Sequence, residues 1–164
     1  MKTFEFRAQQ FVPRPLGEVF SFFETPENLA TITPPGLGFR IITPSPLHMR
    51  EGAEFEYFIS VMGARMRWKS RIDSYEPPHA FSDEQVEGPY RFWHHTHTFK
   101  GVDGGTIIID HVRYAMPFGT WGVVLHNILV RRQLEKIFNH RAKVIERMFG
   151  GVQPEEHGLE ERQR

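Results

Sequence analysis

A single long helical pattern, at residues 121–149, most constrains what this chain can fold into. At 3.6 residues per turn, its apolar side chains fall on one face and most of its charged side chains fall on the other. Gly150 and Gly151 follow the pattern, and glycine commonly ends a helix. Because every other pattern in the chain is a strand or a short helix, we expect the rest of the chain to fold around this helix.

Two features depart from a simple amphipathic helix. Arg141 lies within the apolar face, and a guanidinium is costly to bury without a partner. Either its stem packs while its head reaches water or an acid, or it meets a buried carboxylate, carbonyl groups or an anionic ligand. In the first turns, Leu125, Ile128 and Leu129 lie on the side that is polar further along. These turns therefore pack under a loop or form an exposed apolar patch.

In the sequence before the helix, the side chains alternate between the two faces of a predicted sheet, one of which is exposed to solvent. Trp68 and Ser70 fall on one side of a strand pattern, and Arg67 and Lys69 fall on the other. A strand at residues 3–12 comes first, followed by two short helices. The further strands are predicted at residues 39–43, 55–61, 66–75, 81–86, 91–100 and 106–116. An antiparallel sheet with helices on one face makes the fold class α+β.

Composition narrows the possible functions. The 164 residues suit one domain, predicted at residues 1–151, followed by a mobile charged tail at residues 152–164. The 20 basic and 20 acidic residues balance, so the chain lacks the positive charge of a nucleic-acid-binding surface. The lack of cysteine excludes disulfides, a thiol nucleophile and thiolate metal ligands. With no signal-peptide pattern and no apolar run long enough to span a bilayer, we expect a cytoplasmic protein.

Five short stretches carry a resemblance to a known family. They are FSFFETPENL at 20–29, YEPP at 75–78, GPY at 88–90, WHHTHTF at 93–99 and MPFG at 116–119. With the order of elements, they resemble a bacterial ligand-binding branch of the polyketide cyclase/dehydrase and START-type lipid-transfer superfamily. The resemblance implies a helix-grip fold, in which a curved antiparallel sheet of six to seven strands wraps around the long C-terminal helix. This superfamily includes carriers, cyclases, hydrolases and regulators, so the resemblance implies no single activity.

The stretch at residues 93–99 places polar groups beside aromatic ones. Side chains alternate along a strand, so His95 and His97 share a face with the aromatic residues of this stretch. A hairpin loop at residues 101–105 would place His95 directly opposite Asp110. Both side chains would then point toward the helix that carries Arg141.

Three interpretations of this cluster are open. In the first, His95, Asp110 and Arg141 form a buried network in which each polar group has a hydrogen-bond partner, and this network fixes the register between sheet and helix. In the second, the same groups anchor the polar part of a mostly apolar ligand, joined by Asp83 and Gln85 from the neighbouring strand. In the third, His95 is a general acid or base that Asp110 orients.

A metal ion is a fourth interpretation of the same residues. His95 and His97 lie two apart on a strand, and Asp110 would be the third ligand that a zinc ion needs. Histidine pairs on strands are common without a metal. We therefore expect neither a metal nor another cofactor.

Together these patterns predict a carrier or sensor that binds a small, largely hydrophobic molecule, such as a lipid, a quinone or a polyketide-like compound. The cavity would lie between the sheet and the C-terminal helix. The alternatives are a cyclase- or dehydratase-like enzyme that uses His95 and Asp110, and a protein-interaction module that uses the apolar patch. A monomer or a homodimer is expected, without nucleic acid and without an integral membrane segment. The predicted ligand-binding residues are Trp68, Phe81, Gln85, Trp93, His95, His97, Phe99, Asp110, Tyr114, Phe138 and Arg141.

Overall fold

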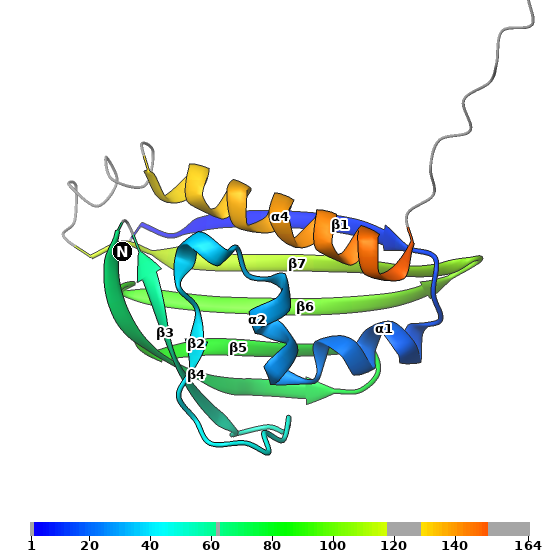
Figure 1. The fold of residues 1–164 in the computed structure, drawn as a ribbon, viewed down its shortest axis with the longest axis horizontal. Coiled ribbons are helices and arrows are strands. Elements are labelled where there is room, and N and C mark those ends of the chain that lie inside the picture. Colours follow the sequence, from blue (N-terminus) through cyan, green and yellow to red (C-terminus); the bar gives the residue numbers. More distant parts are fainter. Residues whose placement is uncertain (1, 62, 118–128, 151–164) are drawn as a thin grey trace, which may run out of the picture.

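The computed structural model describes residues 2–61, 63–117 and 129–150 (Figure 1). Within these ranges, seven strands form one antiparallel sheet in the order β1-β7-β6-β5-β4-β3-β2. In chain order the elements are β1 (Phe4–Val12), α1 (Leu16–Phe23), η1 (Pro26–Asn28), α2 (Leu29–Ile32), η2 (Pro35–Leu37), β2 (Arg40–Ile41), β3 (Glu54–Val61), β4 (Ala64–Glu76), β5 (Ala80–Glu87), β6 (Phe92–Val102), β7 (Gly105–Ala115) and α4 (Arg131–Phe149).

The helices cover one face of a curved sheet (Figure 1). Strands β3 to β7 are paired in sequence order, and β1 returns to pair with β7, so β1 and β2 form the two edges. Helix α4 packs against β1 and α2, while α1 packs against β6 and β7. This arrangement confirms the predicted α+β helix-grip fold. None of the described helices is long and apolar enough to cross a membrane.

The inner face of the sheet holds two hydrophobic clusters that α4 covers in turn. The first surrounds Phe20, Phe99 and Ile145 beneath the C-terminal half of α4. The second surrounds Val112 and Phe138 beneath its N-terminal half. Arg141, which is only 8% exposed, lies on α4 between the two. The sheet therefore meets the helix through apolar contacts at both ends and through a polar group in the middle.

The described residues contain the C-terminal part of the predicted long helix. Helix α4 spans Arg131–Phe149, and Gly150 follows it with φ +80°, as the predicted glycine end requires. The predicted first turns fall mostly at residues 118–128, outside the described residues, and so does the apolar patch apart from Leu129, which is exposed. In the last turn of α4, Met148 is exposed and Phe149 is buried. The predicted tail at residues 152–164 also lies outside the described residues.

The predicted register between β6 and β7 was wrong by two residues. His97, and not His95, lies opposite Asp110, and His95 lies opposite Val112. The prediction assumed a five-residue loop, whereas the strands continue to a two-residue turn at residues 103–104, with Gly104 at φ +78°. Asp-Gly is a strong signal for such a short hairpin turn. Because side chains alternate with a period of two, the shift leaves every residue on its predicted face.

Candidate ligand-binding site

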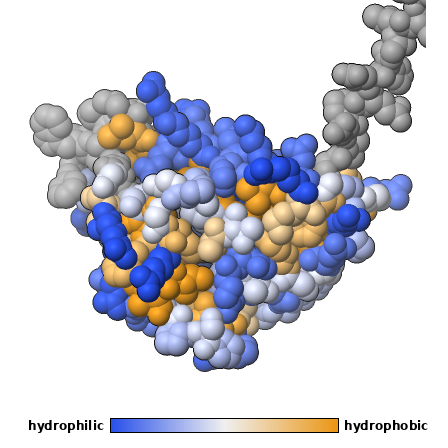
Figure 2. Space-filling model, viewed as in Figure 1, coloured by the Kyte–Doolittle hydropathy of each residue, from blue (hydrophilic) through white to orange (hydrophobic). Residues whose placement is uncertain are grey.

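A cavity of about 220 Å³ lies between the sheet and the helices. Its lining comes from α1 and the segment that leads to β2, from strands β2 to β6 and from α4. Most of the lining is apolar, and much of it is aromatic. Hydrophobic residues also reach the surface on the helix-bearing face (Figure 2). The aromatic lining residues are Phe22, Phe23, Phe39, Phe55, Tyr57, Trp68, Phe81, Tyr90, Trp93 and Phe138.

A row of polar side chains crosses the floor of this cavity from β3 to α4. Neighbouring strands bring inward-facing positions side by side, so inward polar residues on successive strands build a row across the sheet. Asp83 lies opposite His95, and His97 lies opposite Asp110. We call this row the polar stripe; its members are Tyr57, Ser70, Asp83, His95, His97, Asp110 and Arg141.

Ser70 connects the first half of the polar stripe. Trp68 Nε1 donates a hydrogen bond to Ser70 Oγ over 3.1 Å, and Ser70 Oγ donates to Asp83 Oδ1 over 3.4 Å. The hydroxyls of Tyr57 and Ser70 are 3.1 Å apart. Since Ser70 has one proton and gives it to Asp83, Tyr57 is the donor in that pair. Ser70 thereby fixes one carboxylate oxygen of Asp83 and leaves the other free to face the histidines.

Asp110 anchors the second half of the polar stripe. His95 Nε2 bonds to Asp110 Oδ1 over 3.0 Å. His97 Nδ1 and Arg141 Nη2 lie 3.0 and 3.2 Å from the same oxygen, but neither is aligned for a hydrogen bond. The guanidinium of Arg141 also lies 4.7 Å from the centre of the Phe23 ring, which favours its charge. The arginine in the apolar face of α4 therefore meets a buried carboxylate.

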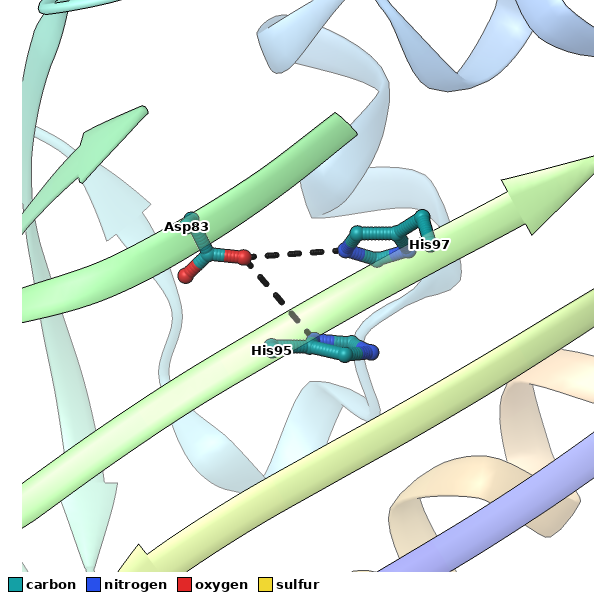
Figure 3. A group of neighbouring side chains, drawn as sticks. All are labelled: Asp83, His95 and His97. Carbon is teal, nitrogen blue, oxygen red and sulfur yellow. Dashed lines mark ion pairs between the residues drawn. The ribbon is translucent and has the colours of Figure 1, made fainter. Parts of the chain in front are cut away.

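Asp83 faces the two histidines from the other side (Figure 3). Its Oδ2 lies 3.9 Å from His95 Nδ1 and 3.6 Å from His97 Nε2. The two imidazole rings are 3.8 Å apart between centroids. Each histidine thus has one ring nitrogen directed at Asp83 and the other directed at Asp110.

Burial and charge separate the protonation behaviour of the two histidines. Burial, reinforced by the neighbouring His97, lowers the pKa of His95 to about 4. Burial would also lower the pKa of His97, but the carboxylates of Asp110 and Asp83 outweigh it and raise that pKa. Burial opposes the charge of Asp110, yet Arg141 and the histidines hold its pKa well below the usual range. The pKa of Asp83 is also lowered, because the neighbouring histidines outweigh its burial.

The structure places most, but not all, of the residues predicted for ligand binding at the cavity. Seven of them line the cavity: Trp68, Phe81, Trp93, His95, His97, Phe138 and Arg141. Phe99 and Tyr114 instead belong to the hydrophobic clusters, and Asp110 lies behind the histidines. Gln85 does not join the polar stripe, because its side-chain amide bonds to the backbone of Tyr90.

Sequence reasoning missed two members of the polar stripe. Alternation assigns Ser70 to the inner face of its strand, but its link to Asp83 depends on a register that shifts at residues 69/70. Tyr57 lies opposite Trp68, so alternation along β3 and β4 together was the signal that could have found it. Asp83 was expected to join the cluster from the neighbouring strand, but it is absent from the list of predicted ligand-binding residues. The structure places it directly against His95 and His97.

Comparison with solved structures shows the same fold in distant proteins. Protein Ms6760 from Mycobacterium smegmatis is 17% identical with a TM-score of 0.65, and 88% of this chain matches 89% of that chain. Protein TTHA0849 from Thermus thermophilus is 19% identical with a TM-score of 0.66, over 87% and 94% of the two chains. The di-domain ARO/CYC protein StfQ from the steffimycin biosynthetic pathway is 11% identical with a TM-score of 0.68, and 90% of this chain matches 50% of that one.

Comparison with protein families gives a more specific result. No curated protein matches the sequence. The model of one family, described as polyketide cyclase/dehydrase and lipid transport, matches residues 12–142. That match includes both short helices, every strand except most of β1, and α4 up to its Arg141 turn. This chain therefore belongs to the polyketide cyclase/dehydrase and lipid transport family.

Proposed function

We propose that this protein binds one small, largely hydrophobic molecule, such as a lipid, a quinone or a polyketide-like compound, as a carrier or sensor. The observation that carries this proposal is the apolar cavity with the polar stripe on its floor. Binding pockets for small molecules typically combine apolar walls with a few placed polar groups that fix orientation. The membership of the chain in a family that covers lipid transport and polyketide cyclisation supports the same class of ligand.

The aromatic walls favour a ligand with a flat or extended apolar body. Trp68 and Trp93 meet edge to face at 5.2 Å between centroids, and Tyr57 stacks on Trp68 at 6.0 Å. These rings hold one another in place, so the wall is formed before a ligand arrives. A pre-formed wall reduces the ordering cost of binding.

The polar stripe favours a ligand with an oxygen-bearing end. Ser70, Asp83, His95 and His97 all line the cavity and offer hydroxyl, carboxylate and imidazole groups. These groups suit the hydroxyl or carbonyl oxygen of a phenol, a quinone or a fatty acid. A purely hydrocarbon ligand would leave them without new partners and would bind less tightly.

A second candidate function is acid–base catalysis of the cyclase or dehydratase kind. The observation that favours it is a pair of buried histidine rings, 3.8 Å apart between centroids, that lies between the carboxylates of Asp83 and Asp110. These surroundings displace the two histidine pKa values in opposite directions, down to about 4 for His95 and upward for His97. Environments that separate the pKa values of two adjacent groups are typical of acid–base pairs. Asp110 would orient both imidazoles. The ARO/CYC proteins among the structural neighbours support this interpretation of the same cavity.

Native mass spectrometry of the untagged 164-residue chain tests both functions. We expect a one-to-one complex with an apolar molecule that denaturation releases, either as purified or after addition of dodecanoate, menadione or 2-naphthol. A β-hydroxyketone is then added as a test substrate, because a dehydratase would remove one water from it. Recovery of this compound unchanged would favour the carrier or sensor, and recovery of a product lighter by one water would favour the enzyme. If no member of the panel forms a one-to-one complex and no molecule co-purifies, the binding proposal is wrong.

A further inference from the structure

We propose that Asp83, His95 and His97 form a binding site for one divalent transition-metal ion, such as Zn²⁺ or Fe²⁺, on the floor of the cavity. Two imidazole nitrogens and one carboxylate oxygen are a donor set that suits these ions. The site goes beyond the binding of an apolar molecule and does not depend on it. It also differs from the site considered from sequence, in which Asp110 was the third ligand.

The geometry of the three side chains carries this inference. One ligand atom from each residue lies within 4.8 Å of the other two. Asp83 Oδ2 is 3.9 Å from His95 Nδ1 and 3.6 Å from His97 Nε2. Ligand atoms around tetrahedral zinc are about 3.4 Å apart, so the two distances to Asp83 Oδ2 exceed that spacing by about 0.5 Å for His95 and about 0.2 Å for His97. Figure 3 shows the three groups converging from β5 and β6.

The groups behind the ligands are arranged as in metal sites. A histidine that binds a metal usually directs its second ring nitrogen to a carboxylate or carbonyl oxygen, which orients the ring. Here, His95 Nε2 is hydrogen-bonded to Asp110 Oδ1 over 3.0 Å, whereas His97 Nδ1 lies 3.0 Å from the same oxygen without the alignment of a hydrogen bond. Asp83 is supported in the same way, because Ser70 Oγ donates to its Oδ1 and leaves Oδ2 toward the histidines. Asp110 is therefore a positioning residue rather than a ligand.

The charges and the accessibility of the site also suit a cation. Arg141 lies 3.2 Å from Asp110 and balances that carboxylate, which leaves Asp83 as the negative ligand. Asp83, His95 and His97 all line the cavity, so the coordination positions opposite them face open space. Water or the oxygen-bearing end of a cavity ligand can occupy those positions. Three protein ligands with open positions are the pattern of metal sites that interact with small molecules.

Metal titration of the untagged 164-residue chain, first stripped with a chelator, tests the site. We expect one Zn²⁺ per chain by calorimetry, and a visible spectrum of protein-bound Co²⁺ that reports nitrogen and oxygen ligands. Asp83→Asn and His97→Gln should each weaken binding by at least about tenfold. His94→Gln is the matched control and should bind as the wild type does, because His94 lies on the same strand but faces outward, 3.2 Å from Asp73.

Two results would overturn the metal site. One is the absence of stoichiometric binding of Zn²⁺ or Co²⁺ by the wild-type chain, which requires no variant to fold. The other is equal binding by Asp83→Asn and His94→Gln, which would assign the metal to surface histidines. The metal titration contains no apolar ligand, so a lack of metal binding would not contradict the proposed binding of a hydrophobic molecule. Equally, a metal site could be present if no apolar molecule binds.

Discussion

Replacement of Arg141 by methionine is expected to lower the free energy of unfolding by about 3–5 kcal/mol. Methionine keeps an unbranched apolar stem but removes the guanidinium that lies 3.2 Å from Asp110. Asp110 is only 5% exposed, so its charge would remain buried without its main counter-charge. Breaking one side of a buried ion pair is far more costly than losing a surface pair. Urea unfolding at pH 7 measures the loss.

Two comparisons make the Arg141 experiment specific. Arg147→Met, at an exposed position of the same helix, should change the stability by no more than about 0.5 kcal/mol. The stability that Asp110 contributes exists above its unfolded pKa and is lost as pH falls through its lowered folded pKa, because Arg141 holds that pKa down. The loss in free energy of unfolding caused by Arg141→Met should therefore be smaller at acidic pH. A loss below about 1 kcal/mol at pH 7 would mean that Arg141 contributes mainly through its stem.

The wild-type protein, stripped of metal with a chelator, is expected to lose about 3 kcal/mol of stability through His95 as pH falls from about 6.5 to about 4. Burial lowers the pKa of His95 to about 4, so the unfolded chain binds a proton in this range before the folded chain does. Proton binding by the unfolded state alone favours unfolding. His97 acts in the opposite direction, because its pKa is raised in the folded state. The stability that His97 contributes is fully present below its pKa in the unfolded chain, and it is lost as pH rises through its pKa in the folded protein.

The variant His95→Gln isolates the contribution of His95. Glutamine can donate a hydrogen bond to Asp110 but does not titrate, so this variant should lack most of the acid slope between pH 6.5 and 4. His94→Gln is the control, because His94 lies on the outer face near Asp73 and should retain the wild-type slope. Asp83 and Asp110 have lowered pKa values, so their losses fall at more acidic pH. An unchanged slope in His95→Gln would show that burial does not keep this histidine neutral.

The face of the sheet on which each residue lies was predictable from sequence, whereas the pairing of residues between neighbouring strands was not. Alternation assigned His95, His97 and Asp110 to the inner face, and an error of two residues in register could not change that assignment. The error itself came from interpreting residues 101–105 as a loop. The structure extends both strands to a turn at Asp103 and Gly104. A hydrogen bond between His95 and Asp110 survives the error, because their side chains meet diagonally across the strands.

The parts of the site that sequence reasoning missed depend on contacts between distant segments. The role of Ser70 requires Trp68 on its own strand, Tyr57 on β3 and Asp83 on β5 at once. No periodicity within one segment encodes such a set. Gln85 is an error of the opposite kind, a residue wrongly included in the site. The alternation of side chains along its strand predicted an inward position, but its side-chain amide donates a hydrogen bond to the backbone carbonyl of Tyr90. Arg141 was more predictable, because a charge in an apolar helix face requires a partner wherever that partner lies.

A titration with 2-naphthol tests the central claim, that the cavity beneath α4 holds the ligand. Ile137 on α4 lines the cavity, so Ile137→Trp would fill part of its volume of about 220 Å³. Glu135→Trp adds the same side chain at an exposed position of the same helix. We expect wild type and Glu135→Trp to bind one 2-naphthol with equal affinity, and Ile137→Trp to bind at least about tenfold more weakly, or about 1.4 kcal/mol. Equal binding by both tryptophan variants would contradict the claim, because the ligand would then lie elsewhere.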